Sequence, residues 1–253
     1  MFAVVDLSDE RNRRFEKYRK HPFTVKRCDV FGCAPFFTVE GHGRYSDFGE
    51  LGRIISRIGT AIFKDGNVPE GLEKCVYSPT VLPLRMLVKS VSEYFREQST
   101  TGRNRKICVV DEKAYAAKEV TELSRYARFV RVVTGRRDTY SAAEQEAFKS
   151  FGAVITAGEN RNLVCGCDCV IALSDRSFNP SSAELSLVYS KTAACDNVFA
   201  VKECSTLPEI SDKAPAGIDR FEFYCALFET CGLRINEIPV FNDAKSILNK
   251  EFA

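Results

Sequence analysis

The chain has 253 residues, 45% of them hydrophobic and 28% charged, enough for two modest domains or one large one with a core of its own. Its 36 basic and 34 acidic residues leave a net charge of +2, so the total charge makes nucleic acid an unlikely partner and favours no anionic membrane. No apolar run approaches the roughly 20 residues that span a bilayer, and the first residues do not have the order of a secretory signal. We therefore expect a cytoplasmic protein with reduced cysteines and no membrane partner.

The first hundred residues predict a small α/β domain. A strand is expected at 1–6, helices at 8–20 and 48–58, and short strands at 61–66 and 75–79. Apolar residues then recur at helical spacing over 84–97, which indicates a helix that closes the domain. The polar stretch 97–106 leads into a new apolar strand. We therefore divide the chain into a small α/β domain over 1–100 and a second domain over 101–253.

The second domain shows a regular alternation of strands and helices. Short β-branched runs predict six strands, at 106–111, 129–135, 153–156, 168–174, 197–202 and 233–241. Helices are expected between them, at 116–127, 141–152, 181–190 and 221–228. Ser141 and Ser181 each precede a glutamate by three residues, the spacing of a capping box. The pattern favours an α/β fold in which the small N-terminal domain precedes a Rossmann-like doubly wound parallel sheet.

The order of these two domains resembles that of shikimate dehydrogenase and glutamyl-tRNA reductase relatives. The Rossmann-like resemblance implies a dinucleotide site at the turn after the first strand, where the superfamily carries G-x-G-x-x-G. Here the turn reads VVDEKAYAAKEV (109–120), without any glycine, and it offers Asp111 and Glu112 where phosphate oxygens would arrive. Carboxylates repel an anionic ligand. The chain therefore looks like a degenerate member of the superfamily, and we expect no cofactor in the usual pyrophosphate mode.

The turns after the second and fourth strands support an alternative with NADP. VTGRRD (133–138) places Thr134, Arg136 and Arg137 where NADP-using Rossmann proteins often keep arginines for the 2′-phosphate. Ser174 and Asp175 follow the fourth strand, at the edge where open α/β sheets bind ligands. These five residues are the candidate cofactor-binding residues. The competing interpretation is a pair of solvated arginines and a polar loop with a helix cap.

Three cysteines alternate in LVCGCDCVIALSD (163–175), at Cys165, Cys167 and Cys169. In a strand they would share one face, and neighbouring thiolates can bind zinc or an iron–sulfur cluster. A closed site needs four ligands, no CxxC pair exists in the chain, and both histidines lie in the other domain. We therefore expect structural, buried cysteines and no metal, while a redox role stays open.

Two further segments of the first domain are candidate sites. In VEGHGRYSDFGEL (39–51), two glycines flank His42 before a helix, a pattern that can hold an anion and offer an acid or base. His42 is thus the candidate catalytic residue, although a tight turn explains the glycines equally well. The segment 11–27 interleaves basic and aromatic residues and could bind RNA or a protein, but a solvated helix face is the simpler interpretation.

The leading hypothesis is a degenerate Rossmann-like protein that binds a small molecule or is non-catalytic. The alternative is an NADP-dependent oxidoreductase with an atypical phosphate turn, and whether the chain is an enzyme stays open.

Overall fold

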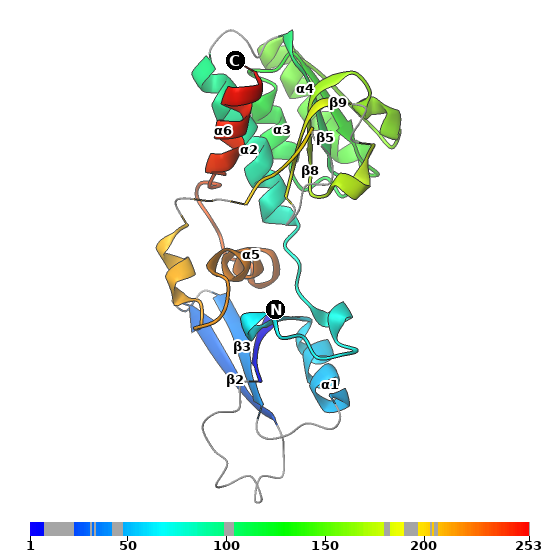
Figure 1. Ribbon diagram of the computed structural model, residues 1–253. Coiled ribbons are helices and arrows are strands. Elements are labelled where there is room, and N and C mark those ends of the chain that lie inside the picture. Colours follow the sequence, from blue (N-terminus) through cyan, green and yellow to red (C-terminus); the bar gives the residue numbers. More distant parts are fainter. Residues whose placement is uncertain are drawn as a thin grey trace, which may run out of the picture. The chain divides into compact units, whose positions relative to one another are not determined.

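The computed structural model describes residues 1–7, 23–30, 32, 34–41, 48–98, 104–179, 183–189, 197–202, 204 and 207–252. They form two compact units, each with its own sheet (Figure 1). The first unit contains residues 1–79 and 207–236, and the second contains residues 80–206 and 237–253. Among the helices within these ranges, none is long and apolar enough to cross a membrane.

The first unit is built on a four-stranded sheet in the order β2-β3-β1-β4. Its strands are β1 (Phe2–Asp6), β2 (Phe23–Val30), β3 (Ala34–Gly41) and β4 (Thr60–Phe63). Strand β1 runs parallel to both of its neighbours, whereas β2 and β3 are antiparallel. The sequence had predicted β1 and β4, but it had not predicted the pair β2 and β3.

Two helices pack on the first sheet. Helix α1 (Gly49–Ile58) buries Leu51 and Ile55 in one apolar cluster with Val5 of β1 and Val39 of β3. Helix α5 (Arg220–Cys231) contacts β1 and β3, with the Phe223 ring 5.7 Å from that of Phe2. Because Val5 faces the α1 cluster and strand side chains alternate, Phe2 and Val5 lie on opposite faces. The unit is therefore a three-layer α/β/α sandwich.

The second unit contains a six-stranded parallel sheet in the order β10-β9-β8-β5-β6-β7. Its strands are β5 (Lys106–Val110), β6 (Phe129–Val133), β7 (Val154–Gly158), β8 (Cys167–Ala172), β9 (Ala183–Val188) and β10 (Val198–Ala200). Numbered along the chain and read from β7, the order is 3-2-1-4-5-6, that of the doubly wound dinucleotide-binding fold. The unit is Rossmann-like. The fold class predicted from the sequence is thus confirmed.

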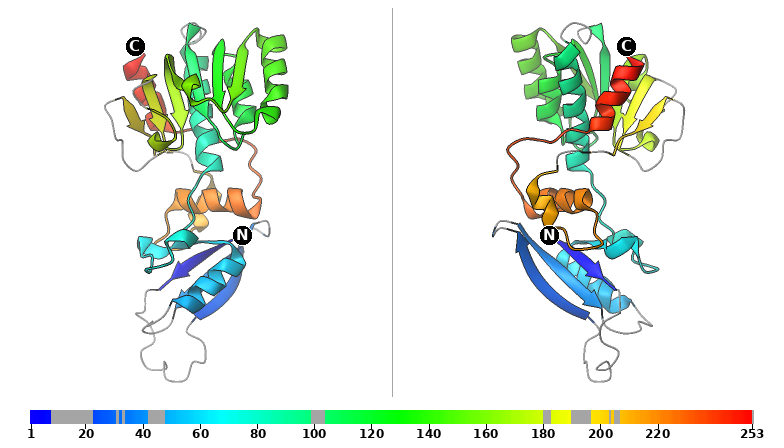
Figure 2. Two further views of the ribbon diagram at one scale, coloured as in Figure 1. Left: turned by 90° about the vertical axis from the view of Figure 1, so that its right-hand side faces the viewer. Right: turned by 60° about the vertical axis from the view of Figure 1, so that its left-hand side comes forward.

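Four helices of this unit form one layer beside the sheet, in the spatial order α6, α2, α3, α4 (Figures 1 and 2). They are α2 (Val81–Gln98), α3 (Ala117–Leu123), α4 (Arg137–Phe151) and α6 (Asn242–Glu251). Helix α4 ends at Phe151, where Gly152 takes a left-handed φ of 63°, in agreement with the helix predicted over 141–152. It begins at Arg137, one turn before the predicted capping box, and Ser141 donates to the carbonyl of Asp138 instead.

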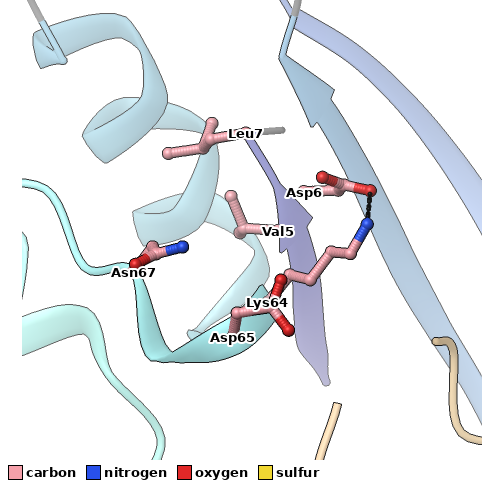
Figure 3. Close-up of a pocket in the computed structure, with 6 residues that line it drawn as sticks. All are labelled: Val5, Asp6, Leu7, Lys64, Asp65 and Asn67. Atoms are coloured by element: carbon pink, nitrogen blue, oxygen red, sulfur yellow. Dashed lines mark hydrogen bonds and ion pairs between the residues drawn. The ribbon is translucent and has the colours of Figure 1, made fainter. Parts of the chain in front are cut away.

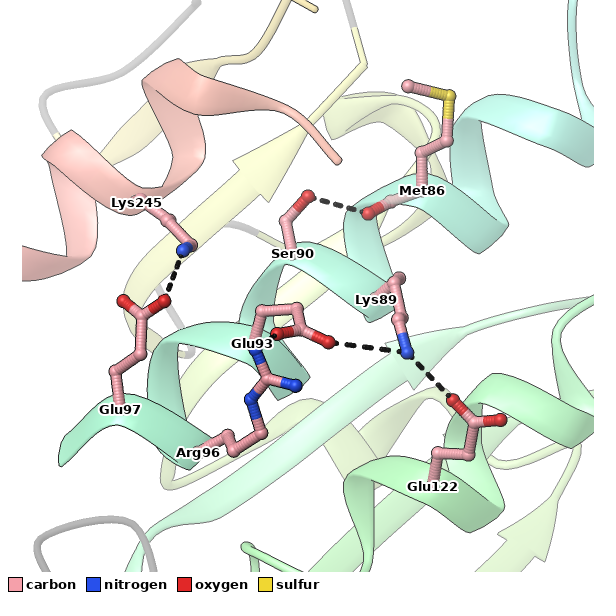
Figure 4. A network of polar contacts seen from close by, with 8 residues as sticks. All are labelled: Met86, Lys89, Ser90, Glu93, Arg96, Glu97, Glu122 and Lys245. Atoms are coloured by element: carbon pink, nitrogen blue, oxygen red, sulfur yellow. Dashed lines mark hydrogen bonds and ion pairs between the residues drawn. The ribbon is translucent and has the colours of Figure 1, made fainter. Parts of the chain in front are cut away.

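Helix α2 places the division between the units before residue 84, not near residue 100 as the sequence suggested. Its Lys89 bridges Glu93 on α2 and Glu122 on α3, with Nζ–O distances of 3.3 and 3.1 Å (Figure 4). Glu97 pairs with Lys245 of α6 at 2.6 Å. These contacts tie α2 to the second unit, while residues 207–236 return to the first. The sequence had placed the boundary near residue 100 instead, within a stretch of which residues 99–103 lie outside the described residues.

The last two predicted strands differ from those in the structure. Residues 183–188, expected in a helix, form strand β9, which lies between β8 and β10 and is buried over Leu185–Val188. Residues 233–241, expected as a strand, contain no strand and lead into α6. Burial between two neighbouring strands thus outweighs the capping-box spacing, whose Ser181 lies outside the described residues.

Candidate functional site

The turn after β5 is the place where a Rossmann fold receives pyrophosphate, and here a buried carboxylate occupies it. Asp111 is 1% exposed and accepts hydrogen bonds from the backbone N–H groups of Tyr115 and Ala116, both at 2.8 Å. These amides lie directly before α3, where a phosphate would find its donors. The buried Tyr140 of α4 donates its hydroxyl to the same carboxylate at 2.7 Å. Asp111 therefore fills the anion position with a group of the chain itself.

One residue of this turn has a backbone conformation that favours glycine. Ala114 has a φ of +60°, a left-handed conformation that costs a residue with a Cβ about 1–2 kcal/mol. Its N–H donates to the carbonyl of Asp111 at 3.1 Å, which closes the turn. The turn is therefore tight, and the Cβ atoms of its residues limit how closely a ligand can approach the backbone.

The residues predicted for a cofactor lie on both sides of Asp111. Thr134, at the end of β6, is 1% exposed, and its hydroxyl accepts from the N–H of Arg136 at 3.0 Å. Arg136 and Arg137 begin α4 and are exposed. Because β6 and β8 both neighbour β5, the two arginines and Ser174 flank the same edge of the sheet.

Ser174 and Asp175 form a local turn after β8. The Ser174 hydroxyl accepts from the N–H of Arg176 at 3.2 Å and lies 3.3 Å from the Asp175 carboxylate, to which it donates. Ser174 thus caps the short 3₁₀ turn Asp175–Ser177 in a polar loop. His42 lies outside the described residues, as do residues 11–22 of the basic segment; residues 23–27 form the start of β2.

A cavity of about 110 Å³ lies in the first unit, at the carboxyl ends of the parallel strands β1 and β4. Asp6 is the last residue of β1 and Lys64 directly follows β4, and Lys64 Nζ lies 2.9 Å from Asp6 Oδ2 (Figure 3). The side chain of Asp6 is 36% exposed and that of Lys64 is 26% exposed, so both are in contact with solvent. Val5, Leu7, Asp65 and Asn67 complete the lining.

The loop below this cavity is held by a tight backbone contact. Asp65 has a left-handed φ of 53°, and its N–H donates to the carbonyl of Gly217 at 2.9 Å. A Cβ on Gly217, whose φ is +81°, would lie 2.7 Å from Lys64 Cγ and 2.8 Å from Asp65 Oδ1. Glycine at 217 therefore lets the segment approach closely enough to fix Lys64 and Asp65 at the cavity.

The chemistry of the cavity follows from its four polar side chains. Lys64 supplies one positive charge, Asp6 and Asp65 supply two negative charges, and Asn67 offers an amide donor and acceptor. The sum of −1 disfavours a free anion but suits hydroxyl or amino groups, which can donate to carboxylates. A second hollow, of about 160 Å³, lies at the amino ends of β5, β6 and β7. Open α/β sheets bind ligands at carboxyl ends, so the Asp6–Lys64 cavity is the better candidate.

The three alternating cysteines do not share one face, so that prediction is wrong. Cys165 precedes β8 and is exposed. Cys167 packs in one cluster with Val170, whereas Cys169, next to Val170 in the strand, must point to the opposite face. The carboxylate of Asp168, which lies between the two cysteines, accepts the N–H of Lys106 at 2.6 Å. Within the described ranges, no three metal-ligating side chains are grouped so as to hold an ion.

Comparison with known proteins gives likenesses of fold alone. No protein-family model matches this chain, and no curated protein matches it in sequence. Among solved structures, an ornithine carbamoyltransferase from Pyrococcus furiosus is 15% identical with a TM-score of 0.35, over 78% of this chain and 74% of that one. A quinate dehydrogenase from Corynebacterium glutamicum in complex with NAD is 8% identical with a TM-score of 0.33, over 99% and 97%.

A shikimate dehydrogenase in complex with NADP⁺ is 11% identical with a TM-score of 0.29, over 74% of this chain and 76% of that one. Shikimate and quinate dehydrogenases are thus among the structural neighbours. Identities and scores at this level assign neither a reaction nor a site residue.

Sequence reasoning missed Asp6, Lys64, Asp65 and Asn67. The signal available was a polar residue at the end of one predicted strand and the KDG turn after another. That signal becomes a site only when β1 and β4 are known to be neighbours, which the sequence pattern did not reveal.

Proposed function

We propose that this chain is a small-molecule-binding protein whose ligand site is the Asp6–Lys64 cavity, and that its Rossmann-like unit takes up no dinucleotide in the pyrophosphate mode. The observation that carries the second part is the Asp111 carboxylate, which occupies both amide donors before α3. The Rossmann-like unit then has a structural role.

Electrostatics supports the exclusion of pyrophosphate. Two unit charges of the same sign 4 Å apart repel by about 4 kcal/mol at the effective dielectric constant of about 20 that applies near a protein surface. That energy corresponds to roughly a thousandfold loss of affinity. Moving the Asp111 carboxylate out of the turn would also cost free energy, because the hydroxyl of the fully buried Tyr140 would lose its hydrogen-bond partner.

Size and charge define the ligand class of the cavity. A volume of about 110 Å³ is the share of three to four water molecules in the liquid, at about 30 Å³ each. This suits a compound, or the head of one, with a few non-hydrogen atoms. Hydroxyl and amino groups match the two carboxylates, and Lys64 can receive a hydroxyl or carboxylate oxygen. We therefore expect a small polyol or amino alcohol.

Thermal unfolding in the presence of glycerol, serine and ethanolamine tests this proposal. At least one compound should raise the unfolding midpoint of the intact protein, because a ligand bound only by the folded state stabilises it. Lys64→Met should remove that shift, and Arg136→Ala, in the other unit, should leave it unchanged. A shift that survives Lys64→Met, or no shift with any of the three compounds, contradicts the proposed site.

An NADP-dependent oxidoreductase is the second candidate, and one observation favours it. Arg136 and Arg137 are exposed at the carboxyl edge of the sheet. A 2′-phosphate could meet them without entering the turn at Asp111. This mode would leave the pyrophosphate without its usual donors, which is why we place it second.

A further inference from the structure

The hollow of about 160 Å³ at the amino ends of β5, β6 and β7 has a lining unlike that of the Asp6–Lys64 cavity. Its side chains follow the register of the sheet: Lys106 of β5 is paired with Phe129 of β6, and Phe129 with Val154 of β7. Two residues further along, Arg131 is paired with Thr156. Because paired residues of neighbouring strands point to the same face, these five side chains form two rows on one face of the sheet.

This face of the sheet is open at the hollow, whereas the opposite face is covered. Val130, Val132 and Ile155 alternate with the residues of the two rows and are buried, and helix α4 packs against β7. Phe129 is 40% exposed and Val154 is 45% exposed, so two large apolar side chains lie next to each other at the surface. A single exposed apolar residue is ordinary, but an adjacent pair beside a hollow offers an apolar group a place to bind.

The charged part of the lining is entirely positive. Lys106 and Arg131 contribute two positive charges, and none of the lining residues is acidic. Among the described residues, neither of these two cations forms an ion pair. Arg131 Nη1 donates to the carbonyls of Leu163 at 3.1 Å and Cys165 at 2.8 Å. These bonds hold the guanidinium in place, and its positive charge stays available because a carbonyl carries no full negative charge.

One carboxylate lies close to the hollow, and it is already engaged. Asp168 of β8 accepts the backbone N–H of Lys106 at 2.6 Å, and its other oxygen lies 4.0 Å from Arg105 Nη1. Its charge is therefore opposed by Arg105. Arg128 places a further guanidinium 5.7 Å from the centre of the Phe129 ring. The hollow and its rim thus carry an excess of positive charge, although the whole chain has a net charge of only +2.

We propose that this hollow is a second ligand site, which binds a small organic anion with an apolar body, an aromatic or branched-chain carboxylate. The carboxylate lies between Lys106 and Arg131, and the Thr156 hydroxyl can donate to it. The apolar body covers Phe129 and Val154 and removes their surface from water. A volume of about 160 Å³ is the share of about five water molecules in the liquid, at about 30 Å³ each, which suits a phenyl ring or a short branched chain.

This site is independent of the proposed function. The Asp6–Lys64 cavity belongs to the other unit, and its charged side chains sum to −1, so it disfavours the anions that the hollow attracts. The hollow also uses none of the residues predicted for a cofactor, which lie at the carboxyl ends of their strands. The two proposals can therefore fail separately.

Titration of the intact protein with matched phenyl compounds, followed by saturation-transfer NMR, tests the proposal. Phenylacetate, phenylacetamide and benzylamine share the ring but are negative, neutral and positive at neutral pH. We expect phenylacetate to bind about tenfold more tightly than the amide, because a neutral group forms no charge pair with either cation. The amine should not bind. No binding of phenylacetate, or equal binding of the three compounds, would overturn the proposal.

Substitutions with matched controls locate the bound anion. Lys106→Gln should weaken phenylacetate binding about threefold, the effect of one exposed charge pair. Lys118→Gln, at an exposed position of α3, should leave it unchanged. Phe129→Ala should weaken binding about fivefold through the lost apolar contact, whereas Phe148→Ala, at an exposed position of α4, should have no effect. If Phe129→Ala does not fold, Val154→Thr tests the same contact with a residue that keeps the β-branch.

Two further variants distinguish the hollow from the other candidate sites. Lys64→Met alters the cavity of the first unit, and Arg136→Ala alters the carboxyl edge of the Rossmann-like sheet. Both variants should bind phenylacetate as tightly as the unaltered protein. Binding that is lost in either variant, or that survives both Lys106→Gln and Phe129→Ala, would place the anion elsewhere and overturn the proposal.

Discussion

Each sheet has an aspartate at the carboxyl end of a strand, in FAVVD (2–6) and ICVVD (107–111). The environments of the two carboxylates differ. Asp111 is 1% exposed and bonded to two amides and a tyrosine hydroxyl. The side chain of Asp6 is 36% exposed and pairs with Lys64 beside a cavity. The same local sequence thus gives a structural cap in one unit and an accessible charge in the other.

The difference comes from what the neighbouring strands supply. Beside Asp111, the chain turns directly into α3, so backbone amides are available, and α4 brings Tyr140. Beside Asp6, Lys64 follows the neighbouring strand β4. The absence of a Cβ at Gly217 allows that segment to lie close to Lys64 and Asp65. A strand-end aspartate is therefore a structural group where backbone amides and a buried hydroxyl bind its carboxylate, and a site candidate where it lines a cavity.

Replacement of the two aspartates should give the largest contrast. Asp111→Ala removes three hydrogen bonds and leaves the buried Tyr140 hydroxyl without its partner, so we expect a loss of about 3 kcal/mol or more. Asp6→Ala should cost less than about 1 kcal/mol, because its ion pair is partly solvated. Urea unfolding of both variants measures the two values. Equal losses would contradict the division into cap and accessible charge.

A methyl group at position 217 should disturb the cavity of the first unit. Gly217→Ala forces a Cβ within 2.8 Å of Lys64 and Asp65, and we expect a loss of about 2–3 kcal/mol. Gly71→Ala is the matched control, since Gly71 has a φ of +85° but no atom within 4 Å of an added Cβ. It should lose only the conformational part, about 1 kcal/mol. If denaturant unfolding gives Gly217→Ala and Gly71→Ala the same loss of stability, the close contact of position 217 with Lys64 and Asp65 does not affect stability.

Glycine should suit the turn after β5 better than the present alanine. Ala114→Gly relieves a left-handed φ of 60°, and we expect the protein to gain about 0.5–1 kcal/mol. Ala117→Gly, at the start of α3, should instead lose about that amount, because glycine has more freedom to lose in a helix. The comparison is made by thermal unfolding. Destabilisation by Ala114→Gly would mean that the turn is not strained.

The parts of the fold that sequence alone predicted depend on local patterns. The β-branched run of β5 and the glycine after α4 are local signals, and both led to the observed elements. Strand β9 was missed because its burial depends on β8 and β10, and a local cap spacing pointed to a helix. Helix α2 was assigned to the first unit because its partners α3 and α6 lie later in the chain.

The candidate sites likewise differ in whether local sequence or contacts between distant residues define them. Asp111 could be singled out because the missing glycines stand directly beside it, although its bond to Tyr140 could not be foreseen. The Asp6–Lys64 cavity joins residues 58 positions apart and depends on Gly217, more than 150 positions further along. Such a site exists only after the strands have paired.

Thermal unfolding of the reduced, intact protein with and without saturating NADPH tests most directly whether Asp111 has taken the place of a dinucleotide. A ligand present at about 100 times its dissociation constant adds roughly 2.7 kcal/mol, which raises the midpoint by several degrees. We predict no change in the midpoint. A clear rise that disappears in Arg136→Ala would contradict the account and would make the edge of the Rossmann-like sheet a working cofactor site.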